Sequence, residues 1–166
     1  MQHRILLALA LFATLAACGW HPRGVQTLPP ELAEIRLVVT PPEPRFSARL
    51  ERSLKLAGVQ VVTRAGVYSL HATTPRPALR NVALDRGARS AEQEMRLEME
   101  FELHNANGDT VYGPRTISAN RVYAYDPNSV IAKLDEEKLI QQELQENLVG
   151  QLFRQLARVD AATLAH

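Results

Sequence analysis

The chain contains a single cysteine, Cys18, in 166 residues. One thiol cannot form an intramolecular disulfide, so the sequence lacks the usual sign of an oxidising compartment. It also lacks a large net charge, because 19 lysines and arginines stand against 18 aspartates and glutamates. Bulk electrostatic attraction to nucleic acid is therefore not expected.

Recognisable catalytic arrangements are absent from the sequence. No two histidines have the H-x-x-x-H spacing of a helical metal site, and no serine lies in a G-x-S-x-G context. The glycines do not form a phosphate-binding loop. The sequence therefore predicts a protein that is not an enzyme, with no catalytic residues, no cofactor and no metal site.

Apolar runs long enough to cross a membrane are lacking as well. Residues 5–13 form an apolar segment that is too short to span a bilayer of roughly 30 Å. This segment follows the positively charged Arg4 and precedes a Leu-Ala-Ala-Cys sequence at 15–18. The order of these features predicts an export signal over residues 1–17 that is removed from the mature protein.

The Leu-Ala-Ala-Cys sequence resembles the bacterial lipobox, which implies cleavage before Cys18 and acylation of its thiol. Each buried acyl methylene contributes ~0.8 kcal/mol, so several chains on one cysteine make a stable membrane anchor. Gly19 follows where lipoproteins retained in the inner membrane often carry aspartate, which favours an outer-membrane address. The alternative is a plain secretory signal in which Cys18 is incidental.

The rest of the chain is long enough for one hydrophobic core and short for two. Residues 19–30 contain three prolines and no apolar periodicity, as expected of an extended tether. We therefore predict residues 18–33 as the acylated cysteine and tether, 34–160 as a single α+β domain, and 161–166 as a flexible tail.

Apolar periodicity predicts the first elements of the domain. Alternating apolar residues favour a strand over 35–39 with one buried face. Helical spacing of apolar residues predicts a helix over 45–57, which ends at Gly58. Short strands, or one interrupted strand, are expected at 59–62 and 67–73, and the two prolines that follow are expected to interrupt the chain.

The second half of the domain gives the clearest patterns. Residues 93–103 alternate strictly between apolar and charged side chains, as in a strand with one buried and one exposed face. A turn at 105–109 then predicts a hairpin with a second strand over 110–125, and a bulge is expected near Gly113. A long amphipathic helix is expected over about 131–159.

The order strand, helix, strands, helix predicts a fold of the α+β class. We expect a two-layer sandwich, with a mixed or antiparallel sheet of about four strands and two helices packed on one face.

Two groups of charged residues are candidates for binding. Four glutamates on the exposed face of the 93–103 strand form either a solvated surface or a surface that meets a polar partner: Glu94, Glu98, Glu100 and Glu102. Five arginines lie between residues 64 and 89, against the single acid Asp85: Arg64, Arg76, Arg80, Arg86 and Arg89. Guanidinium groups bind phosphate bidentately, so this segment suits an anionic glycolipid, and a basic loop kept for solubility is the alternative.

The residues directly after the lipobox, Cys-Gly-Trp-His-Pro-Arg-Gly at 18–24, resemble the start of the mature LptE family. These are the lipopolysaccharide-assembly lipoproteins of Gram-negative outer membranes. Further similarity lies in Ser-Ala-Glu-Gln-Glu-Met at 90–95, in the hairpin that ends at 117–119, and in the long helix that follows Lys133. The resemblance covers most of the mature chain.

This resemblance implies a partner rather than a reaction. Members of the family plug the β-barrel of LptD in a one-to-one complex, assist its assembly, and help to deliver lipopolysaccharide (LPS) to the outer leaflet. Such a protein is held in the outer membrane by its acyl chains and faces the periplasm and the barrel lumen. The alternative is an envelope scaffold lipoprotein for another barrel or a cell-wall complex, without lipid binding.

The resemblance also implies LPS-binding residues. By position, the basic residues that contact LPS in the family fall on Arg86 and Lys133. Arg89 is a third candidate, which charge reasoning alone adds. We expect these side chains to neutralise LPS phosphates.

Overall fold

The computed structural model describes residues 28–84, 90–124 and 130–164. Cys18, Arg86 and Arg89 lie outside the described residues, as do the export signal and nearly all of the tether. The predictions made for them remain predictions.

The described residues form six strands and four helices, two of which are short. In order these are η1 (Pro30–Leu32), β1 (Glu34–Thr40), α2 (Pro44–Leu56), β2 (Gln60–Val61), β3 (Tyr68–Thr73), β4 (Arg76–Leu84), β5 (Ser90–His104), β6 (Thr110–Ala124), α3 (Val130–Leu156) and α4 (Ala161–Leu164).

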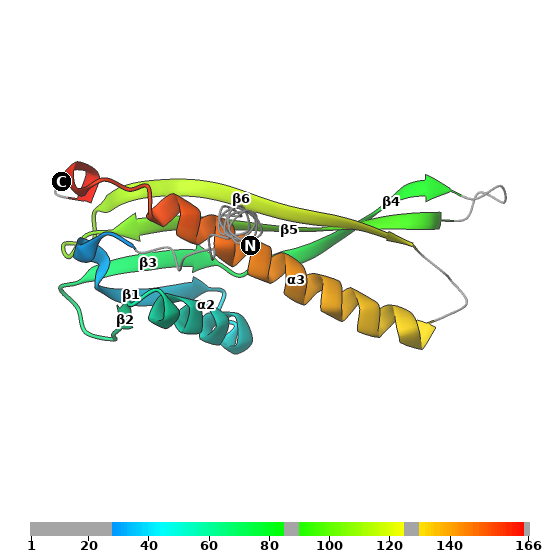
Figure 1. Ribbon diagram of the computed structural model, residues 1–166, viewed down its shortest axis with the longest axis horizontal. Helices are drawn as coiled ribbons and strands as arrows, with labels where there is room; N and C mark the ends of the chain where they lie inside the picture. The colour runs from blue at the N-terminus through cyan, green and yellow to red at the C-terminus, as the bar shows by residue number, and fades with distance from the viewer. Residues whose placement is uncertain (1–27, 85–89, 125–129, 165–166) are drawn as a thin grey trace, which may run out of the picture.

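The strands form one mixed sheet of six strands, with β5 at its centre (Figure 1). β1 lies parallel to both β2 and β3, whereas β5 is antiparallel to β3, β4 and β6. β3 pairs with residues 101–104 of β5 and β4 pairs with residues 90–98, so these two strands follow each other along one side of β5. β6 pairs along the other side.

The α+β class, the mixed sheet and the two packed helices are confirmed, but the sheet has more strands than the four expected. One strand that the sequence did not predict is β4, because Pro75 and Pro77 were expected to interrupt the chain there. Among the described strands β4 pairs only with β5, and an edge position tolerates a proline because one side of the strand makes no ladder hydrogen bonds. Pro75 itself lies in the short connection from β3.

The helices α2 and α3 cover one face of the sheet (Figure 1). α2 begins at Pro44 because the Glu43 carboxylate accepts hydrogen bonds from the backbone N–H groups of Arg45 and Phe46, which have no partner within the helix. None of the described helices combines the length and the apolar character needed to cross a bilayer.

Buried side chains on the two helices and the covered sheet face form one core. β5 contributes every second residue, each 3% exposed or less: Met95, Leu97, Met99, Phe101 and Leu103. α3 contributes a stripe at helical spacing: Ile140, Leu144, Leu148, Leu152 and Leu156. Burial of each large side chain contributes ~1.5–3 kcal/mol, so these periodic residues fix how α3 lies on the sheet.

The described part of the C-terminal segment, residues 161–164, packs against the domain. Residues Ala161–Leu164 form the short helix α4, and the side chain of Leu164 is only 2% exposed. The Tyr68 hydroxyl donates a hydrogen bond to the Leu164 carbonyl, 2.6 Å away. An apolar anchor and a hydrogen bond from β3 therefore hold this segment against the domain.

The second face of the sheet, which we call the open face, is covered by no described helix (Figure 1). The strand register places polar side chains on it, including His71 of β3, Glu102 and Glu98 of β5, and Arg80 of β4.

Candidate functional site

Lys133 belongs to the first turn of α3, and this helix starts at the end of the molecule where β5 begins (Figure 1). Its Nζ is 3.5 Å from Glu137 Oε1. The Tyr123 hydroxyl lies 2.8 Å from the same oxygen and 3.1 Å from Gln93 Oε1, so its proton serves one of these two acceptors at a time. This network connects the Lys133 ammonium to Tyr123 of β6 and Gln93 of β5, and so fixes its position.

Arg80 and Glu94 form an ion pair on the open face. Glu94 is 5% exposed, and its carboxylate also accepts a hydrogen bond from the Asn120 amide. The hydrogen bond from Arg80 lowers the pKa of Glu94 below its ordinary value, and the bond from Asn120 adds to this shift, whereas burial opposes it. The Arg80 guanidinium is therefore paired with Glu94 and is not a free cation that could bind a lipid phosphate.

The burial of Glu94 differs from the solvated surface that was one of the two interpretations of this strand face. Glu98 and Glu100 are exposed as expected, but β4 places Arg80 directly opposite Glu94. Because the sequence patterns missed β4, they also missed this pair.

A second basic region lies between α2, α3 and the start of β4. We call it the basic groove and define it by Arg45, Arg49, Arg76 and Lys138, which line a hollow of about 390 Å³. Arg49 is paired with Glu146 at 2.8 Å. The other three cations make no ion pair within the described part of the chain, so they are available to an anionic ligand.

Sequence reasoning identified only one member of the basic groove, Arg76, as part of the arginine-rich segment. Arg45 and Lys138 belong to two different helices that pack on the same face of the sheet. Nothing in the local sequence of either helix indicates that the other lies beside it. The sequence shows only that each helix has a charged face. This pattern does not distinguish a face that lines a groove between two helices from one that faces solvent.

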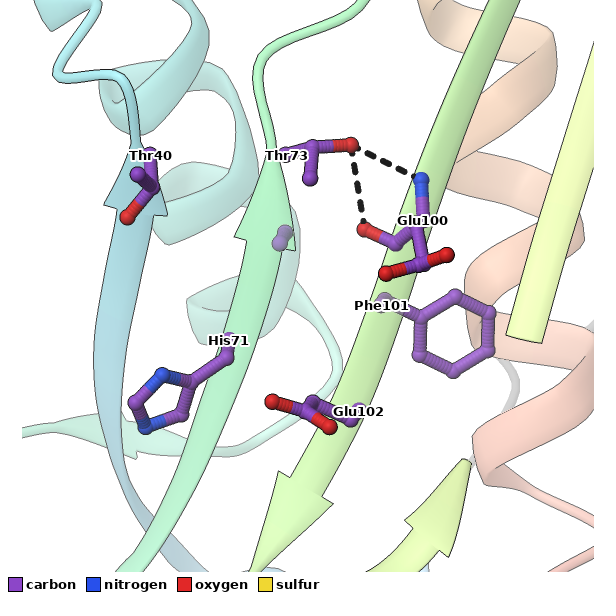
Figure 2. Close-up of a pocket in the computed structure, with 7 residues that line it drawn as sticks. Thr40, His71, Thr73, Glu100, Phe101 and Glu102 are labelled. Carbon is purple, nitrogen blue, oxygen red and sulfur yellow. Dashed lines mark hydrogen bonds between the residues drawn. The ribbon is translucent and has the colours of Figure 1, made fainter. Parts of the chain in front are cut away.

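The structure also brings together two histidines that the sequence patterns left apart. The rings of His71 and His104 are stacked with their centroids 4.2 Å apart and an angle of 12° between their planes. Burial and the neighbouring His104 lower the pKa of His71, so the neutral imidazole is favoured. His71 and Glu102 line a pocket of about 150 Å³ on the open face (Figure 2).

Comparison with known proteins places this arrangement in a family. The profile described as "LptE: Lipopolysaccharide-assembly" matches residues 32–156. The "LPS-assembly lipoprotein LptE" of Pectobacterium atrosepticum is 27% identical over 168 aligned residues, which cover 98% of this chain and 90% of the relative. The protein of the same name from Yersinia pestis is 29% identical, with 98% of this chain and 80% of the relative covered.

Solved structures share the fold. A minor lipoprotein from Acinetobacter baumannii is 26% identical and superposes with a TM-score of 0.63, covering 76% of this chain and 91% of that one. Lipoprotein B from Nitrosomonas europaea superposes with a TM-score of 0.72 over 89% of this chain and 96% of that one, at 22% identity.

Proposed function

Because this chain belongs to the LptE lipopolysaccharide-assembly family, we propose that it pairs with an LptD β-barrel and binds LPS during delivery to the outer leaflet. The family consists of assembly lipoproteins without enzymatic activity, which agrees with the absence of a catalytic motif in the sequence. The observation that carries the proposal is the family match over residues 32–156, which includes the sheet, α2 and α3.

The proposed location is the outer membrane, with acyl chains on Cys18 as the anchor. The relatives are named lipoproteins, and the lipobox at 15–18 is the sequence feature that supports the same processing here. The tether then connects the anchor to the folded domain, which begins at the short helix η1. This arrangement keeps the domain at the membrane surface without a membrane-spanning helix.

The proposed partner is the barrel of LptD, which this domain would plug in a one-to-one complex. Large outer-membrane barrels have a polar lumen, so a plug can carry charged side chains without placing them in lipid. The domain suits such a site because charged residues remain at its surface, including Glu98 and Glu100 of β5. Arg121 is also exposed and forms an ion pair with Glu143 of α3.

The proposed lipid contacts are Lys133, Arg86 and Arg89, with the basic groove as an additional phosphate-binding surface. The network around Lys133 supports its part of the proposal, because it presents a partly exposed ammonium group at a fixed position. Ammonium and guanidinium groups neutralise phosphates and displace the divalent ions that bridge neighbouring LPS molecules. This action weakens LPS–LPS contacts and breaks no covalent bond.

A binding measurement tests the lipid-contact proposal. Purified wild-type protein and an Arg86→Asp/Lys133→Asp variant would be titrated with LPS in detergent, with Arg52→Asp as a control at an exposed site on α2. We expect the double variant to lose binding and the control to retain it. Equal LPS binding by all three proteins would reject these contacts, and no binding by any of them would favour the scaffold alternative.

A further inference from the structure

Three potential metal ligands meet on the open face of the sheet: His71, Glu102 and His104. One ligand atom from each residue lies within 4.8 Å of the corresponding atoms of the other two. We propose that these three residues bind a divalent transition metal ion of the zinc type. This inference concerns a different part of the domain from the proposed lipid contacts and goes beyond the proposed function.

The pairing of β3 with β5 explains why the three side chains meet. His71 stands directly opposite Glu102, and His104 stands opposite Ser69. Side chains two residues apart on one strand point to the same face, so Glu102 and His104 are neighbours along β5. Side chains directly opposite each other across an antiparallel pair start from Cβ atoms about 4.5–5.5 Å apart. The backbone alone therefore brings all three groups together.

One ring nitrogen in this cluster lacks a hydrogen bond. Nε2 of His104 is buried and makes no hydrogen bond within the described part of the chain. A carboxylate oxygen of Glu102 lies 2.9 Å from it, but the geometry of this contact does not form a hydrogen bond. A buried ring nitrogen without a hydrogen bond destabilises the fold, and a metal ion bound to this nitrogen would satisfy it.

The donor set suits a particular class of ion. Two imidazole nitrogens and one carboxylate oxygen are ligands that Zn²⁺ binds at about 2.0–2.2 Å, whereas Mg²⁺ and Ca²⁺ prefer oxygen ligands alone. Ser69 Oγ lies 3.2 Å from His71 Nε2, where a hydroxyl can orient a ligating ring.

The site is open to solvent on one side. Figure 2 shows His71 and Glu102 projecting from neighbouring strands beside the pocket of about 150 Å³. Water can therefore occupy the coordination positions that the protein leaves free, as in zinc sites with three protein ligands. Arg36 of β1 stands opposite Ser69 and opposes a bound cation, whereas the Glu102 carboxylate favours one.

Zinc titration of the purified mature protein without a histidine tag tests the site. Isothermal calorimetry with ZnCl₂ should show one saturable site in the wild type. His71→Ala and His104→Ala should each weaken it by at least about 10-fold, the smaller end of the effect of perturbing a metal site. Glu102→Gln should weaken it less, because the amide keeps a neutral oxygen donor. His21→Ala is the matched control and should bind like the wild type.

Thermal unfolding provides a second readout that does not depend on the variants binding metal. In EDTA, the His71→Ala and His104→Ala proteins should unfold in a single transition, which shows that they are folded. Addition of Zn²⁺ should raise the unfolding temperature of the wild type and the His21→Ala control, because the ion joins β3 to β5 in the folded state alone. Absence of saturable Zn²⁺ binding in the wild type would overturn the proposal, as would undiminished binding after loss of both histidines.

Discussion

Reversal of two charges in the basic groove should weaken LPS binding strongly. Arg76 and Lys138 line the groove from β4 and α3, and neither has an ion-pair partner among the described residues. An exposed ion pair contributes up to ~1 kcal/mol. Replacement of each residue by glutamate removes one attraction to phosphate and adds a repulsion of similar size. The Arg76→Glu/Lys138→Glu variant should therefore lose ~2–4 kcal/mol of binding free energy, which is roughly 30- to 700-fold in Kd.

The assay is titration of labelled protein with lipid A in detergent micelles at two salt concentrations. Charge contacts at an exposed groove weaken with salt, because the Debye length is about 8 Å at physiological ionic strength. Arg52→Glu, on an exposed position of α2, controls for a charge reversal outside the groove, and dephosphorylated lipid A controls for acyl-chain binding. If the double variant binds within about threefold of Arg52→Glu, the groove does not bind phosphate and the reasoning is refuted.

Three further predictions concern the fold that positions these sites. Leu148→Ala should lower the free energy of unfolding by ~2–5 kcal/mol in urea, because this α3 side chain is fully buried, whereas Leu139→Ala, 65% exposed, should change it by less than about 0.5 kcal/mol. Gly113→Ala should destabilise by ~1–3 kcal/mol, because φ is +102° and the new Cβ would lie 2.8 Å from a backbone oxygen of β5. Glu94→Gln should make the free energy of unfolding less dependent on pH in the acidic range. The wild-type carboxylate stabilises the fold above its unfolded-state pKa, and this contribution is lost as the pH falls through the lower folded-state pKa.

Each of these predictions has a clear contrary result. Similar urea stability of the Leu148→Ala and Leu139→Ala proteins would mean that α3 does not pack on the sheet as described. If the free energy of unfolding of Gly113→Ala equals that of the wild type, β5 and β6 do not approach each other as closely as described. Parallel acid-unfolding curves for wild type and Glu94→Gln would show that the pair with Arg80 does not stabilise the fold.

Patterns that repeat along one element were readable from the sequence. Residues 93–103 alternate so regularly that the strand and its buried face follow directly, and β5 extends over Ser90–His104. The long helix was expected over about 131–159, and α3 runs from Val130 to Leu156. The bulge expected near Gly113 is present as a shift of register between β5 and β6. In the strand and in the helix, one face is buried, so apolar residues must recur with the period of that element, and this recurrence is visible in the local sequence.

Features that depend on two distant segments were not readable. The strand β4 was not predicted because it follows and contains prolines, and proline is tolerated in a strand only at the edge of a sheet, a position that the sequence does not reveal. The hidden strand also concealed the pair of Arg80 with Glu94. The His71 and His104 rings meet only because β3 pairs with β5, and strand pairing is not encoded in either strand alone. The basic groove likewise needs the packing of two helices on one sheet face.

Purification of the acylated protein from outer membranes tests the proposed function most directly. We predict that an LptD-type barrel co-purifies in a one-to-one ratio with the wild type, and that LPS accompanies the complex. The Arg86→Asp/Lys133→Asp variant should retain the barrel and lose LPS. Recovery of the wild-type lipoprotein without any such barrel would contradict the account and would leave the scaffold role as the alternative to examine.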